Sequence, residues 1–174
     1  MKTIQLSAIG LITLAILTMS SNNYASTIVN IDARSNTPAN PITLFLTAGT
    51  YNVDPIGIEQ GGLYNAWDAN FTDNIPSWVN HYSVSSSEFS EILVWDGKFY
   101  ASDLIALANA TGMDFTLVAD GYVNFFNGDI YHGDNYLGMS LQVSAVPLPA
   151  AFYLMFSGLL GLGFIQRKLL LKSS

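Results

Sequence analysis

Cysteine is absent from this chain of 174 residues. Disulfide bonds, thiolate metal sites and thiol nucleophiles are therefore all excluded. Histidine is nearly as rare: the chain has two, His81 and His132, too far apart in sequence for the close His pairs of common metal motifs. Without disulfides the fold must be held by burial of apolar side chains, and roughly 120 residues between the two ends are enough for a modest core.

Basic residues are also scarce, with six Lys and Arg against thirteen Asp and Glu. The middle of the chain, residues 26–145, holds all thirteen acidic residues but only two basic ones, Arg34 and Lys98, which leaves a formal charge of −11. Such a surface repels phosphate backbones, so nucleic acid is not expected as a partner. The charge is compatible with divalent cations or with neutral, hydroxyl-rich ligands.

Recognisable catalytic motifs are lacking too. The chain has no Gly-x-Ser-x-Gly elbow and no phosphate-binding Gly-rich loop with its lysine. Glu88 and Glu91 could serve as a glycosidase pair, but such residues more commonly belong to a solvated loop. The sequence therefore predicts a protein that is not an enzyme, with a polysaccharide hydrolase as the less favoured alternative.

The first 25 residues have the three-part layout of a secretory signal peptide. Lys2 is followed by an apolar run from about Leu6 to Met19 and then by a polar stretch that reaches Ala25. Ala25 has the small side chain required before the cleaved bond, so we expect cleavage after it. A retained N-terminal anchor is the alternative, but the apolar run is short for a bilayer span of ~20 residues.

A second apolar segment lies in the tail, residues 146–174. Pro147 and Pro149 cannot lie inside a helix, so a transmembrane helix is expected to begin near Ala150 and to run without charge to Ile165. Sixteen residues in a helix span ~24 Å, which is slightly short of the ~30 Å of a bilayer core, although Leu148 and Gln166 can extend the span. A buried core helix is the alternative, which is disfavoured because every face of the segment is apolar. A cluster of basic residues would stop the chain on the cytoplasmic side: Arg167, Lys168 and Lys172.

The tail thus combines a Val-Pro-x-Pro signature, a short Gly- and Leu-rich span and a terminal basic cluster. In this order it resembles the sorting signal of PEP-CTERM proteins, with Leu148 where the family's name has Glu, as in the VPLPA variant of the signal. The alternative is a plain C-terminal anchor. The motif comprises Val146, Pro147, Leu148, Pro149 and Ala150.

This resemblance implies an exosortase-type processing enzyme as a partner, in the inner membrane of a Gram-negative bacterium that makes exopolysaccharide. The protein would be exported across that membrane and anchored there at least transiently by its C-terminal helix. Its final location would be the cell surface or the extracellular matrix.

Between the two ends, residues 26–145 change to short apolar runs separated by Gly, Asn, Asp and Pro. Their spacing predicts an all-β domain, an antiparallel β-sandwich or jelly roll. Tight turns are expected at Asp96–Gly97 and Asp120–Gly121, each joining two strands as a hairpin. Residues 103–110 fit either a helix or a strand, and we favour the strand. The other strands are expected at 26–32, 41–47, 48–58 with a break at Pro55, 78–84, 91–95, 98–102, 115–119, 122–126 and 137–143.

Residues 27–57 and 126–143 resemble the opening and closing strands of galactose-binding-like jelly rolls. In calcium-dependent bacterial galactose lectins a similar loop before the last strand holds an ion that itself binds sugar hydroxyls. The resemblance implies Asp129, Asp134 and Asn135 as calcium ligands, although the loop here is shorter than in the lectins.

The residues of this loop can be interpreted in two ways. Calcium needs six to eight oxygen ligands, which carboxylates, amides and carbonyls freed by Gly128 and Gly133 could supply. Asn, Asp and Gly are, however, also the ordinary residues of a hairpin turn. The loop also carries the candidate sugar-contacting side chains, for which packing in the core is the alternative: Tyr131, His132 and Tyr136.

Together these patterns predict an exported surface or matrix protein with a non-catalytic glycan-binding domain, calcium being its candidate cofactor and exopolysaccharide its candidate ligand. A purely structural matrix component without a specific ligand is the alternative.

Overall fold

The computed structural model describes residues 26–70, 75, 77–147, 155 and 158. All its strands belong to one compact unit, Asn23–Val146. The predicted signal peptide and its cleavage position at Ala25 lie outside the described residues, as does the predicted tail except for four of its residues. No helix in the described part of the chain is long and apolar enough to cross a membrane.

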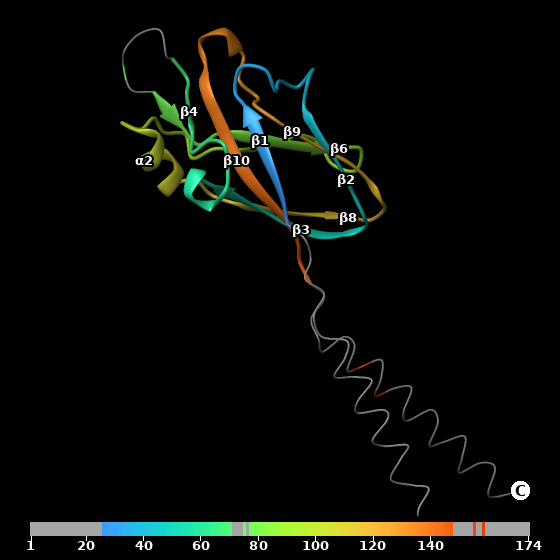
Figure 1. Cartoon of the computed structure of the whole chain (residues 1–174). Helices are drawn as coiled ribbons and strands as arrows, with labels where there is room; N and C mark the ends of the chain where they lie inside the picture. The colour runs from blue at the N-terminus through green and yellow to red at the C-terminus, as the bar shows by residue number, and fades with distance from the viewer. Residues whose placement is uncertain (1–25, 71–74, 76, 148–154, 156–157, 159–174) are drawn as a thin grey trace, which may run out of the picture. The chain divides into compact units, whose positions relative to one another are not determined.

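Short strands dominate the described residues (Figure 1). The strands are β1 (Thr27–Asp32), β2 (Ile42–Leu46), β3 (Gly49–Ile56), β4 (Trp67–Asp68), β5 (Trp78–Val79), β6 (Tyr82–Ser86), β7 (Ile92–Val94), β8 (Met113–Leu117), β9 (Gly121–Phe126) and β10 (Tyr136–Ala145). The helical elements are η1 (Ile58–Gln60), α2 (Asp103–Ala108) and η3 (His132–Asp134).

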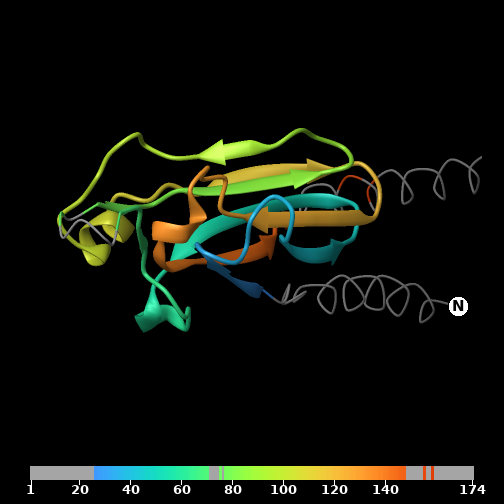
Figure 2. The same cartoon turned by 90° about the horizontal axis from the view of Figure 1, so that it is seen from above.

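The strands form two antiparallel sheets that lie as two layers (Figure 2). The larger sheet has the order β5-β4-β10-β3-β8, with β1 paired to β10, and the smaller sheet has the order β2-β9-β6-β7. Every strand pairing is antiparallel. The prediction of an all-β, sandwich-like domain is confirmed.

The core lies between the two layers and follows from the alternation of apolar side chains. On β10, Met139, Leu141 and Val143 are buried on one face, as their spacing predicts. They belong to one apolar cluster with side chains of the opposite sheet, among them Val84 and Phe125. Each such burial contributes about 1.5–3 kcal/mol to the free energy of unfolding, so this core stabilises the fold without disulfides.

The strand favoured for residues 103–110 is wrong, because this segment begins with the helix α2. The Oγ atom of Ser102 accepts a hydrogen bond from Ile105 N at 3.3 Å and caps the helix, and Asp103 lies in its first turn. Ala106 is the buried residue of the helix, whereas Leu104 remains exposed. A cap followed by an acidic residue is a helix signal that outweighs the alternating pattern here.

The hairpin predicted at Asp120–Gly121 is also wrong. Strand β8 pairs with β3 in the larger sheet, whereas β9 pairs with β2 and β6 in the smaller one. The turn therefore carries the chain from one layer to the other. Gly121 is not among the glycines with positive φ, which a type I′ hairpin would require, and Asp120 Oδ1 instead accepts a hydrogen bond from Ala48 N at 2.8 Å.

The turn predicted at Asp96–Gly97 is present, but its hairpin is not. Gly97 has φ 77°, and Asp96 Oδ1 accepts a hydrogen bond from Lys98 N at 3.1 Å. The strand predicted at 98–102 is wrong, because these residues form no strand and do not pair with β7. Instead, Tyr100 forms an isolated bridge with Trp78, which brings this segment to the edge of the larger sheet.

Most predicted strands differ from the observed ones by one or two residues at their ends, and two differ more. Strand β3 continues through Pro55, which faces Leu141 of β10. Strand β8 begins at Met113, opposite Val53, and therefore does not extend along β3 as far as Pro55. Pro55 has a neighbouring strand on one side only, so its missing N–H group costs no hydrogen bond to a second strand. The predicted strand 78–84 divides into β5 and β6, which belong to different sheets.

Candidate functional site

The acidic loop between β9 and β10 is fastened at both ends to one carbonyl. The Nδ2 atoms of Asn127 and Asn135 donate hydrogen bonds to Ala33 O at 3.0 and 3.1 Å, and all these groups are buried. The backbone N–H of Asn127 also donates a hydrogen bond to Asn36 O at 2.8 Å. The two ends of the intervening segment are therefore fixed at the same place in the fold.

A second group of segments lies opposite this loop. The bridge between Trp78 and Tyr100 contains two backbone hydrogen bonds, of 3.3 and 2.8 Å, and Ala69 N donates to Ser77 O at 3.0 Å. These bonds gather the residues after β4, those before β5 and the segment that contains Phe99.

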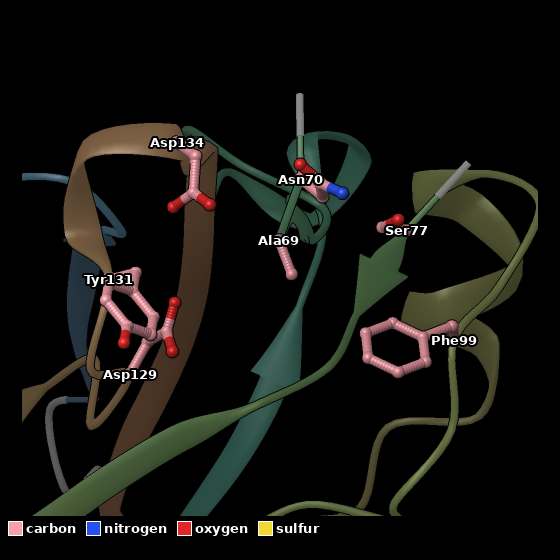
Figure 3. Close-up of a pocket in the computed structure, with 7 residues that line it drawn as sticks. All are labelled: Ala69, Asn70, Ser77, Phe99, Asp129, Tyr131 and Asp134. Carbon is pink, nitrogen blue, oxygen red and sulfur yellow. The ribbon is translucent and has the colours of Figure 1, made fainter. Parts of the chain in front are cut away.

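A pocket of about 520 Å³ lies between the loop and these segments. Figure 3 shows Asp129, Tyr131 and Asp134 on one side, with Ser77 and Phe99 facing them from the other. The rings of Phe99 and Tyr131 are 62% and 74% exposed, so a ligand could cover them. The lining residues are Ala69, Asn70, Ser77, Phe99, Asp129, Tyr131 and Asp134.

The carboxylates of the pocket offer hydrogen-bond acceptors. Asp134 Oδ1 is buried and has no hydrogen-bond partner among the described residues. Asp129 Oδ1 accepts one hydrogen bond, from Ile130 N at 2.7 Å. A buried acceptor without a partner costs about 1–3 kcal/mol, so Asp134 favours a ligand or solvent molecule that donates a hydrogen bond.

No group of three or more His, Asp or Glu side chains that could hold a metal occurs in the described part of the chain. Asp129 and Asp134 are the two acidic residues that line the pocket. A calcium ion at this place would need most of its six to eight oxygens from carbonyls, water or a ligand.

The structure brings three of the six predicted ligand-contacting residues together, since Asp129, Asp134 and Tyr131 all line the pocket. Asn135, the third predicted calcium ligand, is completely buried, and its Oδ1 has no partner among the described residues. The predicted sugar contacts His132 and Tyr136 are not lining residues. His132 Nε2 lies 3.3 Å from Asn127 O, and Tyr136 is the first residue of β10.

Sequence patterns missed the opposite side of the pocket. Phe99 belongs to a segment predicted as a strand, and neither Asn70 nor Ser77 stands in a recognisable motif. Their approach to the acidic loop depends on the bridge from Tyr100 to Trp78, a pairing between distant positions that no local pattern encodes.

The two glutamates considered as a glycosidase pair have different environments. The carboxylate oxygens of Glu88 accept hydrogen bonds from Val118 N at 2.7 Å and Ala119 N at 2.9 Å, so this side chain fastens the turn after β8. The carboxylate of Glu91 instead lies near Gly128, where a Cβ atom would be 2.9 Å from Glu91 Oε1.

The predicted sorting motif begins where the domain ends. Val146 follows β10, and its amide donates a hydrogen bond to Thr50 O at 2.8 Å. Pro147 is the last residue of the continuous described segment. The remaining predicted positions of the tail lie outside the described residues: Leu148, Pro149, Ala150, Arg167, Lys168 and Lys172.

Comparisons with protein-family models, with curated proteins and with solved structures gave no match for this chain.

Proposed function

We propose that the domain binds a neutral carbohydrate in the pocket and has no catalytic role. The observation that carries this proposal is the pairing of two exposed rings, Phe99 and Tyr131, with the carboxylates of Asp129 and Asp134 around one pocket. A sugar ring has apolar C–H faces that pack on aromatic rings, and its hydroxyl groups donate hydrogen bonds. Ionised carboxylates can only accept hydrogen bonds, so they match hydroxyls rather than phosphates or sulfates.

The charge of the domain restricts the ligand further. The formal charge of −11 over residues 26–145 repels polyanions at a distance, and no Lys or Arg is among the described lining residues. A neutral exopolysaccharide is therefore favoured over an acidic one.

Export and sorting form the second half of the proposal. The supporting features are the signal-peptide pattern, the resemblance of the tail to PEP-CTERM signals and the position of Val146 directly after the last strand. The glycan-binding domain, whose finer architecture we take to be a jelly roll, would be presented at the cell surface or released into the matrix after an exosortase-type enzyme processes the tail.

A calcium ion in the pocket is one form of this proposal. Asp129 and Asp134 would bind the ion, and sugar hydroxyls would complete its oxygen shell. Glycan binding that disappears in a chelator and returns with calcium would support this form, whereas binding unchanged by a chelator would leave direct hydrogen bonds to the carboxylates.

The experiment is a glycan array followed by calorimetry with the full-length protein. Tyr131→Ala and Asp134→Asn should each weaken binding at least tenfold, because each removes a contact with the ligand. Tyr122→Ala is the matched control, since Tyr122 is 63% exposed and does not line the pocket. No retention of any glycan, or equal losses in all three variants, would contradict the proposal and favour a purely structural role.

Processing of the tail is tested separately by mass spectrometry of the protein from its native host. A mature form that starts near Ser26 and ends between Val146 and Ala150 would support it. An intact chain from Met1 to Ser174 would contradict it.

A further inference from the structure

Three polar side-chain atoms converge on one point beside Gly128, next to the pocket but outside its lining. A Cβ atom on Gly128 would lie 2.8 Å from Ser83 Oγ, 2.9 Å from Glu91 Oε1 and 3.4 Å from His81 Nε2. Strand pairing explains the convergence. Ser83 faces Phe126 across β6 and β9, so His81 and Gly128 meet just beyond the paired residues. Glu91 directly precedes β7 on the other side of β6, and its side chain extends from there toward Gly128.

Two of these atoms make no hydrogen bond within the described part of the chain. Ser83 is completely buried, and its Oγ has no hydrogen-bond partner in the described part of the chain. The Nε2 atom of His81 is likewise buried without a partner. Native proteins leave few such groups unpaired, and an unobserved ion or water is one physical reason for the exceptions.

The imidazole is also held in a fixed position. Its ring lies 5.6 Å from the ring of Trp67 and 5.9 Å from that of Trp95, and Trp67 Nε1 donates a hydrogen bond to His81 O at 2.9 Å. Glu91 is exposed, so this side of the cluster is open to solutes.

We propose that His81 Nε2, the Glu91 carboxylate and Ser83 Oγ bind a divalent transition-metal ion of the zinc class. Imidazole nitrogen together with carboxylate oxygen suits zinc and its neighbours in the first transition series. The same three atoms suit calcium poorly, because calcium prefers oxygen ligands alone and needs six to eight of them. Water would fill the remaining coordination position. The ion would lie between the three ligand atoms, further from the Gly128 backbone than a Cβ atom would, and the ligand side chains would close to the ~2.0–2.2 Å that zinc requires.

This inference is independent of glycan binding and is tested with the metal alone. The full-length protein is stripped with a chelator, exchanged into chelator-free buffer and titrated with zinc chloride in a calorimeter. We expect one zinc ion per chain. Glu91→Gln keeps the shape of an exposed side chain and should weaken zinc binding by more than the ~10-fold that an outer-shell partner contributes.

Gly128→Ala is the second variant, because its methyl group would occupy the point of convergence. Gly133→Ala is its matched control, since a Cβ atom there meets nothing within 4 Å, and Glu59→Gln is the control for loss of an exposed carboxylate. Both controls should bind zinc as the unmodified protein does, and circular dichroism should show the same fold in all four variants.

Three results would overturn the inference. They are the absence of saturable zinc binding, an unchanged zinc affinity in either Glu91→Gln or Gly128→Ala, and displacement of zinc by an equal concentration of calcium. If zinc binds only through ordered water or scattered surface carboxylates, Gly128→Ala and Gly133→Ala will have the same zinc affinity, which would also contradict the inference.

Discussion

The two ends of the sandwich differ in how many buried polar atoms they leave without a hydrogen-bond partner among the described residues. At the end where β2 and β8 finish, which we call the turn end, side chains fasten the backbone: Glu88 accepts two amide hydrogen bonds and Asp120 accepts one. At the other end, the loop end, several buried polar atoms have no partner among the described residues. They are Asn80 Oδ1, His81 Nε2, Ser83 Oγ, Asp134 Oδ1 and Asn135 Oδ1.

This difference distinguishes polar groups that stabilise the fold from polar groups that a ligand could bond. A bonded polar group stabilises the fold, whereas a buried unbonded one destabilises it unless a ligand arrives. The loop end also contains the pocket and the convergence at Gly128. Polar side chains fasten the backbone at both ends, as Asn127 and Asn135 do at the loop end, but the loop end also holds buried polar atoms that a ligand could bond.

The largest expected effect is the pH dependence caused by His81. Burial lowers the pKa of this histidine from 6.5 to about 4, although Asp129 and Glu91 act in the opposite direction. Between these two values the unfolded chain binds more protons than the folded one, so stability should fall as the pH falls from 6.5 to 4, by roughly 3 kcal/mol in total. Urea denaturation of the metal-free protein at several pH values measures this loss.

His81→Phe is the control for this prediction, because it keeps a ring between the two tryptophans and cannot be protonated. Its stability should change much less over the same pH range. Parallel curves for both proteins would show that other groups cause the loss and would weaken the contrast between the two ends.

Replacing a buried serine whose hydroxyl is hydrogen-bonded should have the next largest effect on stability. Ser140 is completely buried, and its Oγ accepts a hydrogen bond from Tyr64 N at 2.9 Å and lies 2.8 Å from Asn30 Oδ1. Ser140→Ala removes both hydrogen bonds and leaves Tyr64 N without this acceptor, whereas Asn30 Oδ1 still accepts a hydrogen bond from Leu63 N, so the free energy of unfolding should fall by about 2 kcal/mol. Thermal or urea denaturation is the measurement, and an unchanged stability would contradict the role given to bonded groups.

A smaller loss is expected at the turn end. Glu88→Ala removes the carboxylate that accepts hydrogen bonds from Val118 N and Ala119 N. Because Glu88 is exposed, water replaces these bonds in part, and the loss should be about 1 kcal/mol. Glu59→Ala, also at an exposed acidic position, should cost less. Equal losses in the two variants would argue against a fastening role for Glu88.

The smallest effect should have the opposite sign. Ser83→Ala removes a buried hydroxyl that has no partner in the described residues, so the metal-free protein should be equally stable or more stable, by at most ~1 kcal/mol. The comparison with Ser140→Ala uses the same substitution at an equally buried position. A clear destabilisation by Ser83→Ala would mean that this hydroxyl serves the fold and would remove the distinction between the two ends.

Local patterns predicted most of the strands but not their partners. The alternation of Met139, Leu141 and Val143 identified the buried face of β10, because side chains in a strand alternate between its two faces. The Asp120–Gly121 pair predicted a turn, yet the strands on its two sides joined different sheets. Pairing depends on contacts between residues far apart in the sequence, which local composition does not encode.

The candidate site divides in the same way. Its acidic side could be predicted, since Asp129, Tyr131 and Asp134 stand within six residues of one another in a loop. Phe99 could not, because it is thirty residues away from Asp129 and reaches the pocket through the bridge between Tyr100 and Trp78. The convergence at Gly128 was equally hidden, since it combines residues of three segments.

By itself, the amino-acid sequence determined the strand-rich middle region, its negative charge and the composition of its loops, because these depend on single residues and their nearest neighbours. The tertiary structure alone decided which strand entered which sheet, which ring faced which carboxylate and which polar atoms were buried without a partner. Those outcomes arise when two layers pack together, because only the packed state brings distant side chains within contact distance and removes them from water.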